Sequence, residues 1–586
     1  MIYQEKYLQL LSKEFPTIQS VSTELINLSA ILNLPKGTEV FITDIHGEYD
    51  AFNHYLKNAS GIIKEKIELL FSDLSEKKRN QIAFFIYYPT DMLNKYKKKL
   101  DSEKLKSLLE EQLFYMIRLA KNIVSKYTKS KVGKTLPKEF SYIIQELIYE
   151  SRSHEDKGKY YDAIIDAIFK TKRESIFILE LSRFIRTLAI DQLHIVGDIF
   201  DRGPKPQLVM EKLLRINNVD IQWGNHDIAF IGASCGSKVM IANVIRVAAR
   251  YNNLDTFEDG YGINLLPLAR LAQKYYSQDP CKDFYPKNSE TINSLEDLSF
   301  IARMHKAIAI IQFKLEGEVI KKNPNFNLDD RLLLEKIDFD KNRILIEDKY
   351  HQLSDNHFPT IDKDNPYALN KDEFEVINHL RQLFLHNEML QTHARYVIEK
   401  GGLYLLYNGN LLFHAAIPLL EDGSFASVKI DKKTYNGKSL FDKFDKIVRT
   451  AYYNRYDNNG DIDYFLYLWQ GKYSPLFGKS TMKTFERYFV KDKKTHKEIL
   501  NPYYKYREND LVLKRIYQEF NLDFSKSKII NGHVPLDVTK GEQVVLANMH
   551  IYTIDGGMSK QYADKTNIGG YSLISDSHAY FLVSHE

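Results

Sequence analysis

The stretch "DQLHIVGDIFDRGPKP", residues 191–206, ends a predicted buried strand with two aspartates and an arginine. The run Leu193–Val196 is largely apolar, and Asp198, Asp201 and Arg202 follow it within six residues. Burying a carboxylate or a guanidinium is costly unless a group of opposite charge pairs with it. We therefore expect either a polar turn in water or a site that binds both a cation and an anion.

Four further β-rich runs also end in Asp, Asn or His, often beside glycine. They are "TEVFITD" (38–44), "NVDIQWGN" (218–225), "NLLFHA" (410–415) and "KIINGH" (528–533). Long segments with helical periodicity separate these runs, chiefly residues 104–127 and 160–190. Strands with polar ends that alternate with helices predict an α/β body whose chemistry lies at the strand ends.

Charge and cysteine content limit the class of protein. The net charge of +4, from 81 basic and 77 acidic residues, is too balanced for a protein that coats nucleic acid. Two cysteines, Cys235 and Cys281, exclude a disulfide framework and a cysteine-rich zinc site and indicate reduced thiols. The first residues do not resemble a signal peptide, and no apolar run is long enough to cross a bilayer. We expect a cytoplasmic protein with no nucleic-acid or membrane partner.

The polar strand ends carry metal-ligand residue types in one order along the chain. They are Asp44 and His46 in "TDIHGE", Asp198 and Asp201 in "GDIFDRG", Asn225 and His226 in "GNHD", His414 in "LFHAAIP" and His533 in "NGHVP". Each residue alone is more often a structural turn residue. Five such strand ends in one chain indicate a shared site, because independent turns have no reason to use these residue types. His54, His154 and His305 lack this context, and we expect them to be structural.

Two divalent cations that share a site need a bridging anion and several oxygen and imidazole donors. Asp198 is the expected bridge. The remaining expected ligands are Asp44 and His46 for one ion and Asn225, His414 and His533 for the other. A donor set without thiolate favours Mn²⁺, iron or Zn²⁺ over Ca²⁺ or copper. A hydroxide held between the two ions would attack phosphorus.

Three further residues have predicted catalytic roles. Arg202 can bind two phosphate oxygens with its guanidinium fork. Asp201 can orient His226 as the general acid that protonates the leaving alkoxide. The structural alternative is an ion pair between Asp201 and Arg202 within the loop.

The order D-x-H, G-D-x-x-D-R-G, G-N-H-[DE] and two later histidines resembles the calcineurin-like metallophosphoesterase superfamily. This resemblance implies an α/β sandwich of two mixed β-sheets flanked by helices. "GNHD" and the alanines of "FHAAIP" depart from the phosphoprotein-phosphatase branch. Asp44 and Asp198 are also much further apart in the chain than in simple members.

These long separations predict a discontinuous core with large α-helical insertions. The core would comprise residues 1–50, 188–240 and 400–586. A helical insertion would occupy residues 51–187, and a second, mainly helical insertion would occupy residues 241–399. Segments that emerge from these loops would pack above or beside the metals and narrow access to the site.

Over its whole length the chain is similar to the class III fructose-1,6-bisphosphatases of Gram-positive bacteria. The segments that carry this likeness are "IANVIRVAARYNNLDTFEDGYGINLLPLA" (241–269), "WQGKYSPLFGKSTMKTFERYF" (469–489) and "TIDGGMSKQYADKTNIGGYSLI" (553–574). The resemblance implies gluconeogenic hydrolysis of fructose 1,6-bisphosphate to fructose 6-phosphate and phosphate, with Mn²⁺ as the favoured metal. It also implies nucleotide or phosphoenolpyruvate effectors. The oligomeric state stays open, a homo-oligomer included.

A bisphosphate carries a second anion away from the metals, so its pocket needs further cations. Arg246 and Arg250 lie four residues apart on a predicted helix and would share one face. Lys472, Lys479 and Arg487 lie between the two late histidines and are further candidates. Surface salt bridges are the structural alternative for each of these five cations.

Two other functions remain open at this point. One is a phosphoprotein phosphatase or a dinucleotide-polyphosphate hydrolase with the same dimetal core. The other is a non-enzymatic scaffold that keeps the metallophosphoesterase fold. The presence of all six ligand positions together with Asp201, Arg202 and His226 favours an enzyme.

Overall fold

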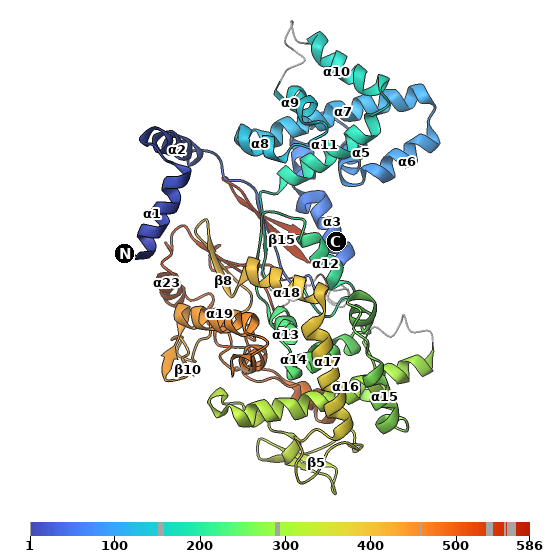
Figure 1. Cartoon of the computed structure of the whole chain (residues 1–586), viewed down its shortest axis with the longest axis vertical. Helices are drawn as coiled ribbons and strands as arrows, with labels where there is room; N and C mark the ends of the chain where they lie inside the picture. The colour runs from blue at the N-terminus through green and yellow to red at the C-terminus, as the bar shows by residue number, and fades with distance from the viewer. Residues whose placement is uncertain are drawn as a thin grey trace. The chain divides into compact units, whose positions relative to one another are not determined.

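The computed structural model describes residues 2–149, 158–287, 294–457, 460–534, 543–555, 558 and 570–585. The chain forms an α/β structure with many helices and several β-sheets (Figure 1), as the sequence predicted. It divides into two compact units. The smaller comprises Met1–Val40, His54–Gln192 and Leu573–Val583, and the larger comprises Phe41–Asn53, Leu193–Ser572 and Ser584–Glu586.

The smaller unit is mainly helical. Its helices include α1 (Ile2–Glu14), α2 (Ile18–Ile31), α4 (Ile62–Leu70), α5 (Glu76–Tyr87), α6 (Pro89–Lys99), α7 (Ser102–Val124), α8 (Lys129–Thr135), α9 (Ser141–Tyr149), α10 (Gly158–Lys170) and α11 (Glu174–Ala189). Helix α7 buries Leu109, Leu113 and Met116 at helical spacing, which confirms the helix predicted over residues 104–127. The periodic stretch 160–190 is two helices, α10 and α11, because Lys172 has a left-handed backbone that ends the first.

Two sheets contain the five predicted strands, which are all present. One sheet has the strand order β16–β15–β1–β2–β3–β7, and the other has the order β13–β14–β12–β9–β8. The strands of the first are β1 (Glu39–Ile42), β2 (Gln192–Ile195), β3 (Val219–Gln222), β7 (Gly401–Gly402), β15 (Tyr571–Ser575) and β16 (Tyr580–Ser584). Those of the second are β8 (Tyr404–Tyr407), β9 (Asn410–Phe413), β12 (Lys528–Asn531), β13 (Val545–Leu546) and β14 (Ile551–Thr553).

The strand directions bring polar strand ends together. β2, β3 and β7 are parallel, and β9, β12 and β14 are parallel in the second sheet. β8 and β13 run antiparallel to their neighbours, so the second sheet is mixed. Because parallel strands end at the same edge of a sheet, residues that follow β9 and β12 emerge side by side.

Helices make up much of the larger unit. They include α12 (Pro206–Leu213), α13 (Asn225–Ser234), α14 (Lys238–Arg250), α15 (Leu266–Tyr276), α16 (Leu295–Lys322), α17 (Lys371–His386), α18 (Glu388–Lys400), α19 (Gly437–Tyr453), α20 (Tyr464–Gln470), α21 (Thr484–Phe489) and α23 (Asp510–Glu519). The long helix α16 packs against α14 and α15 (Figure 1). A small sheet of β4 (Ile337–Asp338), β5 (Arg343–Ile346) and β6 (Lys349–Gln352) lies within the segment predicted as mainly helical.

The structure also bears on the predictions of reduced thiols and of a chain without a membrane-spanning segment. Cys235 and Cys281 are both free and buried, which agrees with the prediction of reduced thiols. Among the described residues, no helix combines the length and the apolar character needed to span a membrane. His154 and most of the segment 553–574 lie outside the described residues.

A buried ion pair holds α16 to α17. Lys314 Nζ lies 2.7 Å from Glu373 Oε2 and donates to the Thr360 carbonyl at 2.6 Å. Burial lowers the pKa of Lys314, and the Glu373 carboxylate opposes that shift. Because neither side chain is exposed to water, the two opposite charges must stabilise each other.

We expect Glu373→Gln to lower the free energy of unfolding by about 3 kcal/mol, since it leaves a buried ammonium without its counter-charge. Glu375→Gln is the matched control on the same helix, because its partner Lys371 lies 4.0 Å away and both side chains are exposed. The control should change stability by less than about 0.5 kcal/mol. Chemical denaturation measures both variants, and equal effects would contradict the assigned role of the buried pair.

Candidate functional site

The predicted ligand residues all belong to the larger unit, and each follows the end of one of five strands. β1 is followed by Asp44 and His46, β2 by Asp198, β3 by Asn225, β9 by His414 and β12 by His533. All six are buried except His533, which is half-buried. Two groups have atoms close enough to hold an ion, namely Asp44 with His46 and Asp198, and Asp198 with His414 and His533. Asp198 belongs to both groups.

The distances place one oxygen of Asp198 between the two groups. His46 Nε2 lies 3.8 Å from Asp198 Oδ2 and 3.4 Å from Asp44 Oδ1. His414 Nε2 lies 3.4 Å from the same Asp198 oxygen and 3.1 Å from His533 Nδ1. Burial would raise the pKa of Asp198, but the neighbouring histidines, His414 first, lower it well below its usual range.

Backbone carbonyls orient the three histidine rings. The nitrogen–oxygen pairs are His46 Nδ1 with Phe200 at 3.1 Å, His414 Nδ1 with Val196 at 2.9 Å and His533 Nε2 with Phe477 at 3.0 Å. A carbonyl only accepts hydrogen bonds, so each of these nitrogens carries the ring proton. In a neutral ring, the opposite nitrogen then offers a lone pair, as in metal sites with a fixed tautomer.

Unpaired buried atoms test whether these residues fit metal ions. Of the predicted ligand residues, His46 and Asn225 each have a buried atom, Nε2 and Oδ1 respectively, without a hydrogen-bond partner. Such atoms are costly to bury, and both are donor types that divalent transition metals accept. Burial would lower the pKa of His414, but Asp198 and Asp44 raise it to about 10. A proton and a metal ion would therefore compete for the same His414 lone pair.

The backbone of the site is strained. Six of the nine predicted metal-ligand and catalytic residues have φ between 49° and 73°: Asp44, His46, Asp198, Asp201, Arg202 and His533. Side chains with a Cβ seldom adopt this left-handed conformation. Hydrogen bonds from Asp44 N to the Gly197 carbonyl at 3.0 Å and from His46 N to the Asp198 carbonyl at 2.9 Å hold two of these loops together. Such clustered strain is typical of functional sites.

Asp227 stabilises the loop that carries Asp198. Its carboxylate accepts hydrogen bonds from the backbone N–H groups of Asp198, Ile199 and Gly224 at 2.8, 2.8 and 2.9 Å. A Cβ at Gly224 would collide with the Asp198 carboxylate, so only glycine fits this approach. No role was predicted for Asp227 from the sequence, although its position in "GNHD" was the available signal.

The predicted catalytic residues lie beside the ligand groups. His226 begins helix α13 together with Asn225, and His226 Nδ1 lies 2.9 Å from Asp201 Oδ2. Arg202 Nη2 lies 3.3 Å from His226 Nε2. Burial lowers the pKa of His226 well below its usual range and raises the pKa of Asp201 to about 7. Asp201 therefore contacts the His226 ring directly, which is the contact that an orienting role requires.

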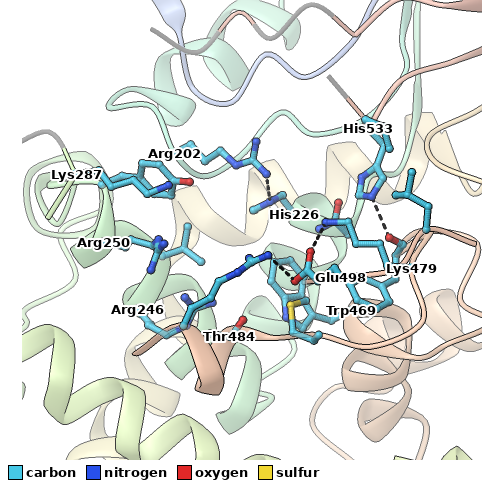
Figure 2. A pocket seen from close by; sticks show the side chains of 18 residues that line it. Arg202, His226, Arg246, Arg250, Lys287, Trp469, Lys479, Thr484, Glu498 and His533 are labelled. Atoms are coloured by element: carbon cyan, nitrogen blue, oxygen red, sulfur yellow. Dashed lines mark hydrogen bonds and ion pairs between the residues drawn. The ribbon is translucent and has the colours of Figure 1, made fainter. Parts of the chain in front are cut away.

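A cavity of about 330 Å³ opens beside His226 and His533, and the larger unit supplies its whole lining (Figure 2). The cations in this lining are Arg202, Arg246, Arg250, Lys287, Lys479 and Arg487. Of the five cations predicted to bind substrate, Lys472 is the exception. It is exposed, and its Nζ lies 5.3 Å from the ring centroid of Tyr473. The sequence did not predict Lys287 as a cavity-lining cation, because it follows a segment without regular periodicity.

The cations that line the cavity differ in whether a carboxylate pairs with them. Glu498 pairs with Lys479 at 2.7 Å and with Arg487 at 3.2 Å. Among the described residues, no ion pair involves Arg246, Arg250 or Lys287, which lie across the cavity from Lys479 (Figure 2). We call these three residues the cation wall. A phosphate at the cation wall would not have to displace a carboxylate.

The chain is similar to known proteins over almost its whole length. Residues 6–586 match the family model described as Firmicute fructose-1,6-bisphosphatase. Two relatives named fructose-1,6-bisphosphatase class 3, from Clostridium tetani and Clostridium acetobutylicum, are each 50% identical to this chain over 99% of its length and 88% of their own. A relative of the same name from Clostridium botulinum is 49% identical over 99% of this chain and 87% of its own. No solved structure matches the chain. The chain belongs to the Firmicute fructose-1,6-bisphosphatase family.

Proposed function

We propose that this protein is a metal-dependent phosphatase that hydrolyses fructose 1,6-bisphosphate to fructose 6-phosphate and phosphate. The observation that carries the proposal is one cavity lined both by His226 and His533 and by the cation wall, whose three residues make no ion pair with any residue that the structure describes. A bisphosphate needs both features, because one phosphate reacts while the other only binds. Membership of the Firmicute fructose-1,6-bisphosphatase family supports this substrate.

The proposal includes the calcineurin-like sandwich as the fold. Its support is that ligand residues follow strands of two different sheets and converge. The division into a core of residues 1–50, 188–240 and 400–586 and insertions at 51–187 and 241–399 belongs to the same proposal. The cation wall lies within the second of these insertions.

The two ligand groups would hold two divalent ions. Asp198 would bridge them, with Asp44 and His46 on one ion and with Asn225, His414 and His533 on the other. Mn²⁺ fits this oxygen and imidazole donor set, as do iron and Zn²⁺. When bound, the ions would supply Lewis acidity and lower the pKa of a water molecule to near neutrality.

The residues around the ligands would bind and protonate the substrate. Arg202 would hold oxygens of the reacting phosphate near His226. Asp201 accepts the Nδ1–H of His226, so the Nε2 side of the ring faces Arg202. In its protonated form, His226 would donate from Nε2 to the leaving sugar oxygen, and Asp201 would stabilise the imidazolium.

The cation wall would bind the phosphate that does not react. Arg246 and Arg250 lie on helix α14 and line the cavity with Lys287. Lys479 and Arg487 are already paired with Glu498, so they would contribute less to phosphate binding. Lys472, which the sequence also suggested as a substrate ligand, does not line the cavity, so the proposal does not include it.

The alternative substrates are less well supported. A phosphoprotein phosphatase must admit a segment of another chain, and a dinucleotide-polyphosphate hydrolase must admit a much longer molecule. The family match does not favour either activity. Nucleotide or phosphoenolpyruvate effectors, a homo-oligomer and a cytoplasmic location stay predictions.

We expect the Mn²⁺-loaded protein to release phosphate from fructose 1,6-bisphosphate with a kcat/KM at least about 100-fold higher than from a phosphopeptide or a dinucleotide polyphosphate. This ratio corresponds to about two hydrogen bonds to a charged group, which the remote phosphate would make with the cation wall. A chelator should abolish the activity, and Mn²⁺ should restore it better than Ca²⁺. Phosphopeptide turnover equal to that of the sugar bisphosphate would refute the proposed substrate.

His226→Ala should lower kcat for fructose 1,6-bisphosphate by roughly 10²–10⁴, the usual contribution of a general acid. The loss should be smaller for an aryl phosphate, because its leaving group needs less protonation. Steady-state kinetics on both substrates measures this difference. His54→Ala is the control, since His54 is an exposed histidine of the smaller unit. Equal losses on both substrates would make His226 a structural residue.

Arg250→Ala should raise KM for fructose 1,6-bisphosphate by about 10-fold or more, the effect of losing a hydrogen bond between charged groups. Its kcat/KM for an aryl monophosphate should stay close to the wild-type value, because that substrate lacks the second phosphate. Lys472→Ala also removes one cation but lies outside the cavity lining, so it should leave both substrates unaffected. If Lys472→Ala and Arg250→Ala behave alike, the cation wall does not bind the second phosphate.

A further inference from the structure

A series of buried, hydrogen-bonded side chains contacts the arginines of the cation wall. It begins with His305 on helix α16. His305 is 1% exposed, its Nδ1 lies 2.8 Å from the Phe284 carbonyl, and its Nε2 lies 2.8 Å from Tyr488 Oη. The carbonyl can only accept, so Nδ1 carries the ring proton. Burial lowers the pKa of His305 to about 3, so the ring is neutral and Nε2 is an acceptor.

The direction of the Tyr488 hydroxyl follows from this tautomer. Tyr488 must donate its single proton to His305 Nε2, which leaves only lone pairs on the phenol oxygen for other partners. Arg246 Nη1 lies 3.2 Å from that oxygen. The Arg250 guanidinium lies 5.3 Å from the centroid of the Tyr488 ring, within the range of a cation–π interaction. One tyrosine therefore contacts both arginines.

Neutral acceptors hold Arg246 in place. Its Nε donates to Gln312 Oε1 at 2.6 Å, its Nη2 donates to Asn243 Oδ1 at 2.8 Å, and its Nη1 donates to Tyr488. These bonds use three of the five N–H groups of the guanidinium. Glu316 lies one step further, where it accepts from Gln312 Nε2 at 2.7 Å, and burial raises its pKa.

Two other cations that line the cavity are held in a different way. Lys479 and Arg487 are held by the Glu498 carboxylate, with which an incoming phosphate would have to compete. An amide or phenol oxygen fixes the orientation of a guanidinium without cancelling its charge. Fixing a long side chain before binding also removes part of the entropy loss on ligand binding.

We propose that Tyr488, oriented by His305, is a positioning residue that holds Arg246 and Arg250 ready to bind the phosphate that is not hydrolysed. This inference rests on the proposed function, because it assumes a substrate with a second phosphate. It gives His305 a role beyond the purely structural one expected from the sequence.

The first test is Tyr488→Phe, which removes the hydroxyl and keeps the ring. KM for fructose 1,6-bisphosphate should rise roughly 10-fold, with kcat changed much less, because the variant disturbs binding of the remote phosphate. The kcat/KM for p-nitrophenyl phosphate, which has no second phosphate, should stay at the wild-type value.

Tyr276→Phe is the matched control. Tyr276 is also fully buried, its hydroxyl lies 3.4 Å from Thr360 Oγ1, and Lys306 Nζ lies 5.5 Å from its ring centroid. Neither of these partners belongs to the cation wall, so loss of the Tyr276 hydroxyl should leave KM for the bisphosphate unchanged. Melting temperatures of both variants show whether their stabilities change to a similar extent.

A second pair of variants tests the role of His305 independently. His305→Leu removes the acceptor, so the Tyr488 proton can turn toward Arg246, and KM for the bisphosphate should rise as in Tyr488→Phe. His305→Gln can still donate to Phe284 and accept from Tyr488, so it should retain most of the wild-type affinity. The double variant Tyr488→Phe/His305→Leu should be no worse than Tyr488→Phe alone, because both act through one proton.

The outcomes separate this inference from the proposed function. Wild-type protein that hydrolyses p-nitrophenyl phosphate but not fructose 1,6-bisphosphate overturns both. If the wild type is active on the bisphosphate, equal losses on both substrates in Tyr488→Phe overturn the positioning role alone. The positioning role is also overturned if Tyr276→Phe raises KM as much, or if His305→Gln and His305→Leu are equally impaired.

Discussion

The Asp198 carboxylate is the group on which the rest of the site depends. It is buried, it lies within 4 Å of His46 and His414, and a second carboxylate, that of Asp44, contacts the same His46. Lone pairs and negative charges that face one another away from water are stable only with a cation or a proton between them. The left-handed backbone at Asp198 and the three hydrogen bonds to Asp227 serve to hold this carboxylate in place.

The cavity beside this centre uses two different ways of burying positive charge. The Glu498 carboxylate neutralises Lys479 and Arg487. Arg246 is instead held by a phenol and two amide oxygens, none of which cancels its charge. A dianionic ligand is attracted most strongly where the positive charge is fixed but not compensated. This asymmetry gives the proposed substrate an orientation, with its reacting phosphate toward His226 and its other phosphate toward Arg246.

Much of the fold could be predicted because its signals are local. Each of the five β-rich runs became a strand, and the periodic stretch 104–127 became helix α7. The break at Lys172 within the stretch 160–190 could not be read from periodicity, since apolar spacing continues across it. The small sheet of β4, β5 and β6 was also missed, because its strands are two to four residues long and only their mutual pairing stabilises them.

The sequence by itself determined which residues could act as ligands, because Asp, Asn and His directly after buried strands must emerge at a sheet edge wherever the strands pair. The sequence could not determine which distant Lys and Arg residues line the cavity beside these ligands. Lys472 and Lys479 lie seven residues apart, yet only Lys479 lines the cavity, while Lys287 reaches it from a segment without a recognisable pattern. Nor could it show that Tyr488 connects His305 to Arg246. This last relation depends on contacts between α14, α16 and α21, which join residues far apart in the chain and therefore arise only in the tertiary structure.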